Sequence, residues 1–134
     1  MTEIRREPIL RLMPGPADIN ANGHIFGGWV LCQMDKAAGI VARLHSRGPV
    51  ATIAIERMEF LAPILLGDLI TVYADIESTG RTSMKIRIEV MAGRELGAVR
   101  MKVTEGLFTF VAIDDEARPR PVPADAPPMP GSER

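Results

Sequence analysis

The sequence predicts an α+β protein in which one long helix is wrapped by an antiparallel sheet. A single helical periodicity follows Gly27-Gly28, with apolar side chains three and four residues apart. From Val50 onward the period changes to two, and the spacers between the alternating runs are short, as in antiparallel neighbours. A chain with one helix and one set of strands has to bury that helix against the sheet.

Length and composition indicate one globular domain. The chain has 134 residues, 46% of them hydrophobic and 25% charged, and a formal net charge of −1. This balance gives no general attraction to nucleic acid or to an anionic membrane, and aromatic residues, at 4%, are few for base stacking. The single cysteine excludes an intrachain disulfide. Together with the lack of an apolar leader or spanning segment, it predicts a cytoplasmic location.

Proline and glycine mark the ends of the expected elements. A short strand is expected at 9–13 and a loop at 17–26, which turns at Asn22-Gly23. The helix opens at Gly27-Gly28 and ends at 45–49. Its apolar face is expected to hold Phe26, Val30, Met34, Ala37, Val41 and Leu44. Long strands are expected at 52–60, 69–78, 82–92 and 99–112, with a hairpin loop at 93–97. The single domain is placed at 1–114, and the proline-rich tail at 115–134 is predicted to be extended or disordered.

The stretch from Asn20 to Asp35 combines a turn, two glycines and an acid. It reads N-A-N-G-H-I-F-G-G-W-V-L-C-Q-M-D. In this stretch the chain resembles the hotdog-fold acyl-CoA thioesterases, in the bacterial YciA-type branch. The supporting pieces are P-A-D at 16–18, F-L-x-P at 60–63, G-D at 67–68, T-S at 82–83 and T-E-G-L-F-T-F-V-A-I-D at 104–114. Cys32 stands where a Ser is usual in this branch, and the 93–97 loop is short.

The resemblance implies a hotdog fold, in which a curved antiparallel sheet wraps around one long central helix. It implies homodimers with shared active sites, assembled as a hexamer that is a trimer of dimers. The implied activity is hydrolysis of acyl-CoA to a free carboxylic acid and coenzyme A, with Asp35 as the catalytic carboxylate. Coenzyme A is then part of the substrate and product, and no separate cofactor or metal is expected.

Thioester hydrolysis needs an activated nucleophile and donors for the carbonyl oxygen. Asp35 could serve as general base toward water or as the nucleophile itself. The backbone amides of Gly27 and Gly28 open the helix, where the dipole favours a developing negative charge. Eight residues of helix separate Gly27 from Asp35, about 12 Å, so one thioester cannot touch both in one chain. A site shared by two subunits is therefore expected, and the small residues Ala37 to Gly39 are expected to let the paired helices approach.

Several further side chains are candidates for contacts with the substrate. The amide of Asn20 is expected to orient the water or the thioester carbonyl. Asn22 and Gly23 suit turn chemistry as well as binding. The candidate residues for contacts with acyl-CoA are Asn22, Gly23, Phe26, Gly27, Arg81, Thr82, Ser83 and Lys85. Arg81, Thr82 and Ser83 offer a guanidinium and hydroxyls for phosphate, whereas Lys85 is equally well explained as part of a solvated strand face.

Two alternatives remain at this point. The first is a non-catalytic acyl-CoA binding or sensor module, which has no need for an acid at position 35. The second is a hotdog acyl-thioester hydratase or dehydratase, but such enzymes use a helix His, and this helix has none before His45. The two His and one Cys are too isolated for a metal site, and no G-x-S-x-G elbow is present.

Overall fold

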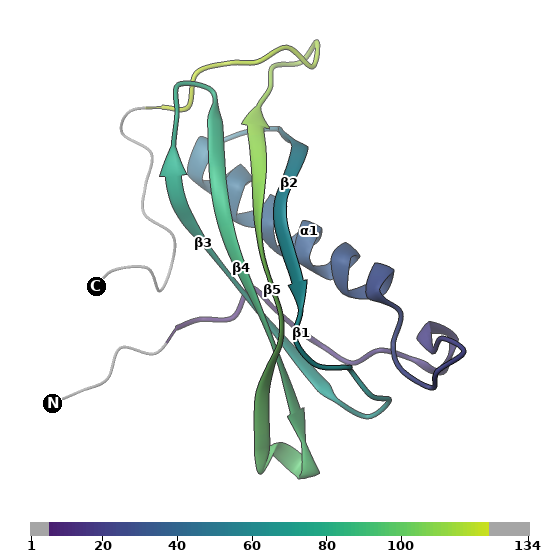
Figure 1. Ribbon diagram of the computed structural model, residues 1–134. Helices are drawn as coiled ribbons and strands as arrows, with labels where there is room; N and C mark the ends of the chain where they lie inside the picture. Colours follow the sequence, from purple (N-terminus) through teal and green to yellow (C-terminus); the bar gives the residue numbers. More distant parts are fainter. Residues whose placement is uncertain (1–5, 124–134) are drawn as a thin grey trace, which may run out of the picture.

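The computed structural model describes residues 6–123 as a five-stranded antiparallel sheet with one long helix against one face (Figure 1). The strand order is β1-β3-β4-β5-β2. The elements are β1 (Leu10–Leu12), η1 (Pro16–Asp18), α1 (Gly27–Ser46), β2 (Val50–Phe60), β3 (Leu69–Thr79), β4 (Ser83–Arg94), η2 (Glu95–Gly97) and β5 (Val99–Ala112). The predicted α+β class and every long strand are confirmed. The hairpin loop is shorter than predicted, because β4 continues through Arg94.

The buried stripe of α1 faces the sheet. Val30, Met34 and Val41 are at most 2% exposed, as predicted. Phe26 and Leu44 were wrongly placed on this stripe, since they are 50% and 51% exposed. Phe26 is the N-cap, with φ −56° and ψ 137°, so helical periodicity does not apply to it. Because a helix has 3.6 residues per turn, the positions that face the sheet shift gradually along α1. In its last turns the buried residues are Ala42 and Ser46, and Leu44 lies outside the stripe.

Small residues bring the helix close to the sheet. A Cβ on Gly106 of β5 would lie 3.0 Å from Met34 Cε and 3.0 Å from the Arg57 carbonyl oxygen. Ala37 and Ala38 are fully buried within the protomer. The prediction that the small residues serve pairing of two helices is therefore wrong for these two alanines, because their closest packing is helix against sheet.

The chain beyond β5 turns back over the C-terminal end of α1. Ile113 and Pro119 form an isolated antiparallel bridge, and the Val122 amide donates to the Arg81 carbonyl at 2.8 Å. Arg120 donates to the Ser46 carbonyl at 2.9 Å and to the Ile113 carbonyl at 2.7 Å. The first part of the proline-rich tail is thus tied to the domain, and its remainder, 124–134, lies outside the described residues.

Strand β2 forms one edge of the sheet. It pairs with β5 on one side, and within residues 6–123 no strand pairs with its other side. Ile53 and Ile55 on this strand are 57% and 46% exposed. A long edge with exposed apolar side chains is a surface that other strands can pair with.

Within residues 6–123, no helix is long and apolar enough to cross a bilayer.

Candidate active site

Asp35 lies in a groove between α1 and β2. Its carboxylate Oδ1 accepts a hydrogen bond of 2.6 Å from the hydroxyl of Thr52, which lies near the start of β2. The groove has a volume of about 300 Å³ and is lined by Gly28, Leu31, Cys32, Asp35, Thr52, Ile55 and Phe108. Asp35 is exposed in the protomer, so its carboxylate is held by Thr52 at one oxygen and remains open to solvent.

Thr52 was missed by the sequence reasoning. The residue opens a run of alternating strand residues, and nothing in that pattern marks it as a partner of a helix acid. Only the packing of β2 along α1 brings the hydroxyl to Asp35. A hydrogen bond to a carboxylate fixes its orientation, which a reacting group needs.

A second cavity lies where the helix begins. It has a volume of about 370 Å³, and Asn20, Gly27, Phe60 and Thr104 are among its lining residues. The Phe60 ring packs over Gly27, where an added Cβ would lie 3.2 Å from the ring. Thr104 is 1% exposed, and its hydroxyl has no hydrogen-bond partner among the described residues. The cavity therefore offers a buried hydroxyl beside the first helical amides.

The first two amides of α1 are available to a ligand. The N–H groups of Trp29 and Val30 donate to the Phe26 carbonyl, at 3.1 and 3.5 Å. Within residues 6–123, no acceptor is found for the N–H groups of Gly27 and Gly28, as expected for the first residues of a helix. A Cβ on Gly28 would meet no atom within 4 Å, so the space in front of this residue is open.

The turn before the helix is built by Asn20. Its side-chain oxygen accepts from the amides of Asn22 at 2.9 Å and His24 at 3.1 Å. The NH₂ group of Asn20 has no hydrogen-bond partner in the described part of the chain, and the residue lines the cavity at the helix start. Asn22 is exposed, and Gly23 takes the turn's left-handed position with φ +80°. The structure brings Asn20 and Gly27 together, and places Gly28 in the groove with Asp35.

The predicted phosphate-binding residues lie at the other end of the helix. Arg81 and Thr82 lie in the β3–β4 turn, and Ser83 is the first residue of β4. The preceding Thr79 hydroxyl is 3.3 Å from Nε2 of His45, in the last turn of α1. A 20-residue helix is about 30 Å long. A single chain therefore does not bring these residues to Gly27.

Lys85 lies on the sheet face that points away from the helix. Its neighbours Met84 and Ile86 are fully buried against α1, and side chains alternate along a strand. In residues 6–123 no group of three or more His, Cys, Asp and Glu side chains is arranged to hold a metal ion.

Two side chains with shifted pKa values, Glu89 and Lys102, lie on the outer face of the sheet, which is the face that points away from α1. Lys102 beside Glu89 lowers the pKa of that carboxyl, and Glu89 in turn raises the pKa of Lys102.

Comparison with known proteins gives one consistent family. Residues 22–98 match the Thioesterase superfamily. The acyl-CoA thioester hydrolase YciA of Salmonella typhimurium is 45% identical over 121 residues, which cover 87% of this chain and 90% of the relative.

Solved structures agree with this match. The hexameric thioesterase of Yersinia pestis superposes with a TM-score of 0.84 at 42% identity, covering 89% of this chain and 97% of that one. A hexameric hotdog fold thioesterase of Campylobacter jejuni superposes with a TM-score of 0.82 at 35% identity, covering 87% and 90%. The match extends over Asp35, Thr52 and the helix start.

Proposed function

The chain belongs to the thioesterase superfamily, and we infer that it is an acyl-CoA thioester hydrolase, which releases a free carboxylic acid and coenzyme A. The observation that carries this function is Asp35, whose carboxylate is held by Thr52 in a groove between α1 and β2. A fixed carboxylate can activate water, and unpaired amides at a helix start can bind the carbonyl oxygen, so the chain has both groups that acyl transfer to water requires.

We propose that Asp35 supplies or activates the nucleophile. Thr52 occupies Oδ1, which leaves Oδ2 to accept a proton from water as the water oxygen attacks the thioester carbon. In the alternative, the same oxygen attacks the carbon and forms an anhydride that water then cleaves. In both cases the carbon–sulfur bond breaks and the coenzyme A thiolate leaves and takes up a proton.

The amides of Gly27 and Gly28 are proposed to bind the carbonyl oxygen. Their N–H groups have no acceptor among residues 6–123, and the helix dipole favours negative charge there. The free NH₂ group of Asn20 adds a third donor in the cavity that Gly27 lines. Removal of one such donor typically costs about 10²- to 10³-fold in rate.

A second copy of the chain is proposed to complete the site. The free edge of β2 exposes Ile53 and Ile55, and antiparallel pairing of two such edges across a two-fold axis would cover both. The start of one β2, with Thr52, then lies toward the end of the other, where Phe60 packs over Gly27. Asp35 then lies beside the cavity at the partner's helix start, which supports a site shared between subunits.

The same pairing gives a role to the β3–β4 turn. Two-fold related helices run in opposite directions, so the end of one lies toward the beginning of the other. Arg81, Thr82 and Ser83 are therefore proposed to contact the phosphates of a substrate bound at the partner's helix start, with Asn22, Gly23 and Phe26 at the rim. Phe26 is half exposed in the protomer, as a contact residue would be.

The oligomeric state, the lack of a cofactor and the cellular location are proposed from the relatives and from the residues present. The hexameric relatives support a trimer of dimers. Asp35 and the helix amides suffice for hydrolysis, so we propose a reaction without a separate cofactor. The free, exposed thiol of Cys32 suits a reducing compartment, which supports a cytoplasmic location. The catalytic domain is proposed to span 1–114, followed by the tail at 115–134.

Thiol release from a series of acyl-CoA substrates tests the function. The wild type should release coenzyme A, and Asp35→Asn should lose at least about 10²-fold in kcat while it still binds substrate. Equal rates for both proteins would refute the role of Asp35. Binding by the wild type without thiol release would favour a sensor, and hydration of an unsaturated acyl group without release would favour a hydratase.

A further inference from the structure

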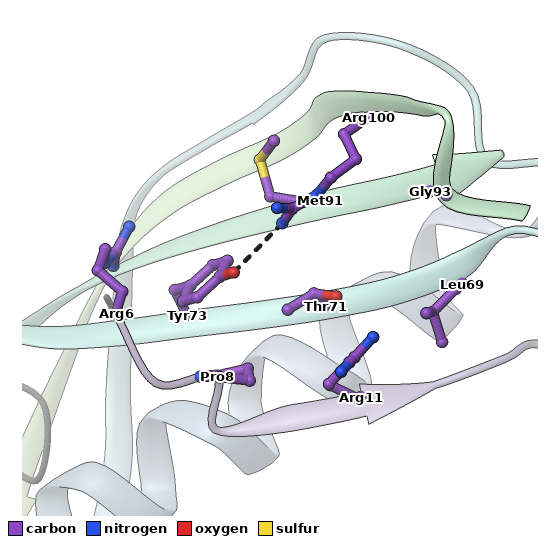
Figure 2. Close-up of a pocket in the computed structure, with 10 residues that line it drawn as sticks. Arg6, Pro8, Arg11, Leu69, Thr71, Tyr73, Met91, Gly93 and Arg100 are labelled. Carbon is purple, nitrogen blue, oxygen red and sulfur yellow. Dashed lines mark hydrogen bonds between the residues drawn. The ribbon is translucent and has the colours of Figure 1, made fainter. Parts of the chain in front are cut away.

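A third cavity lies on the sheet face that points away from α1. Its volume is about 730 Å³, and it lies between β1, β3 and the β4–β5 hairpin. Ile70 and Val72 are fully buried on the helix side of β3, so the alternating Thr71 and Tyr73 point into this cavity (Figure 2). The sheet separates it from Asp35.

Arginines line this cavity, and acidic residues do not. Arg6, Arg11 and Arg100 are among its lining residues, and among the described residues no Asp or Glu lines it. Arg6 is neutralised by ion pairs with Asp75 and, at 2.6 Å, with Glu89. Its guanidinium also lies 4.5 Å from the centre of the Tyr73 ring. Arg6 therefore acts as a wall of the cavity, with its charge already compensated.

Arg11 and Arg100 carry uncompensated charge. Within residues 6–123, neither side chain has a carboxylate partner. Arg100 donates one hydrogen bond of 3.2 Å to the Tyr73 hydroxyl, which leaves most of its N–H groups free. Figure 2 shows Arg11 and Arg100 on opposite sides of the cavity, with the side chains of Thr71 and Tyr73 between them.

We propose that this cavity binds an anionic ligand that carries phosphate groups on an apolar body. Two guanidiniums facing one space with two hydroxyls suit phosphate oxygens, which accept paired N–H donors. Pro8, Leu69 and Met91 supply apolar walls for the rest of the ligand. The volume lies in the range of small-molecule sites. Because the sheet separates this cavity from Asp35, the ligand is distinct from the reacting thioester.

Calorimetric titration of the intact oligomer tests the site. Coenzyme A is left out, because its own phosphates would compete for the cavity, and Arg81→Gln, at the proposed phosphate contact of the catalytic site, should leave ADP binding to the cavity unchanged. ADP and inorganic pyrophosphate should bind, and uncharged adenosine should not. Arg11→Gln and Arg100→Gln should each weaken ADP binding at least about tenfold, the loss of one charge-assisted contact. Arg118→Gln removes an exposed arginine paired with Glu116 and should leave binding unchanged.

Activity separates this proposal from the catalytic one. Both cavity arginines are exposed, so their variants should keep the wild-type unfolding temperature and rate of thiol release. Absence of ADP binding would overturn the proposal, and so would binding that Arg11→Gln and Arg100→Gln leave intact. Loss of thiol release in Asp35→Asn bears only on the catalytic site.

Discussion

The hydroxyl of Thr52 donates a hydrogen bond of 2.6 Å to Oδ1 of Asp35, which joins β2 to the helix at the centre of the proposed site. The bond fixes the orientation of the carboxylate in the groove. Carboxylates otherwise rotate about a soft terminal torsion, and a reacting group in several orientations is productive for only part of the time.

Thr52→Ala should therefore lower kcat by about 10- to 100-fold, the value of one hydrogen bond to a charged group. KM should change little, because Thr52 orients Asp35 and is not proposed to bind coenzyme A. Thr52→Ser is the matched control, since it keeps the hydroxyl and should recover most of the rate. Steady-state thiol release measures both. An equal loss in the alanine and serine variants would show that the methyl group, and not the hydrogen bond, matters.

A shared site predicts complementation between two inactive variants. A subunit with Asp35→Asn keeps its helix amides, and a subunit with Gly28→Val keeps its carboxylate. In a mixed dimer one site receives both lesions and the other receives none. Random mixing gives one half mixed dimers, so about a quarter of wild-type activity should return.

Co-expression with two different affinity tags shows that both variants are present in one oligomer of the random mixture used for this measurement. Each variant expressed alone is the control and should be inactive. Mixed dimers without activity would place Asp35 and Gly28 of the same chain in one site.

Local patterns predicted the elements, and long-range packing decided the residues that were missed. Period-two alternation located every long strand, and the glycine pair located the start of α1. Thr52 escaped notice because periodicity gives the face of a strand residue but not its partner. Arg11 and Arg100 escaped notice as a pair for the same reason, since β1 and β5 approach one cavity only in the folded sheet.

At the C-terminal end of α1, local sequence patterns predicted where the helix stops but not which residue contacts it. Arg47 adopts a left-handed conformation with φ 59°, followed by Gly48, and that stop was expected from the Gly-Pro sequence. Arg120 was not expected there, because it lies in the proline-rich tail. Its contacts with α1 depend on the turn at 114–118 that reverses the chain.

Arg120→Ala should destabilise the fold. The guanidinium donates to the carbonyls of Ser46, Pro49 and Ile113, at 2.9, 3.2 and 2.7 Å, and its removal leaves these acceptors with fewer partners. The expected loss is about 2 to 3 kcal/mol in the free energy of unfolding. Gly48→Ala should act in the same direction, because an added Cβ would lie 2.6 Å from the Arg120 guanidinium.

Urea unfolding followed by circular dichroism measures the Arg120 effect. Arg118→Ala is the control, since Arg118 is 74% exposed and pairs only with Glu116 among the described residues. It should cost less than about 0.5 kcal/mol. Equal stability of the Arg120 and Arg118 variants would mean that the tail contributes nothing to the end of α1.

The ion pair of Glu89 with Lys102 on the outer face of the sheet predicts that stability depends on pH. Lys102 lies 2.8 Å from Glu89, and with Arg6 it lowers the pKa of Glu89 below 4.5. A lowered folded pKa means that this carboxylate stabilises the fold above its unfolded pKa, and that the contribution fades as pH falls through the folded value. Lys102 has a raised pKa, so its contribution is present below 10.5 and fades as pH rises through its higher folded pKa.

Glu89→Gln should therefore flatten the acid side of the stability profile. Between about pH 7 and pH 3 the wild type should lose about 1 kcal/mol more than the variant, the size expected for a partly exposed network. Glu77→Gln changes an exposed acid on β3 and should leave the wild-type profile unchanged. Urea midpoints at each pH give the comparison. Parallel profiles for Glu89→Gln and the wild type would show that Arg6 and Lys102 do not stabilise the charged form of Glu89 in the folded state.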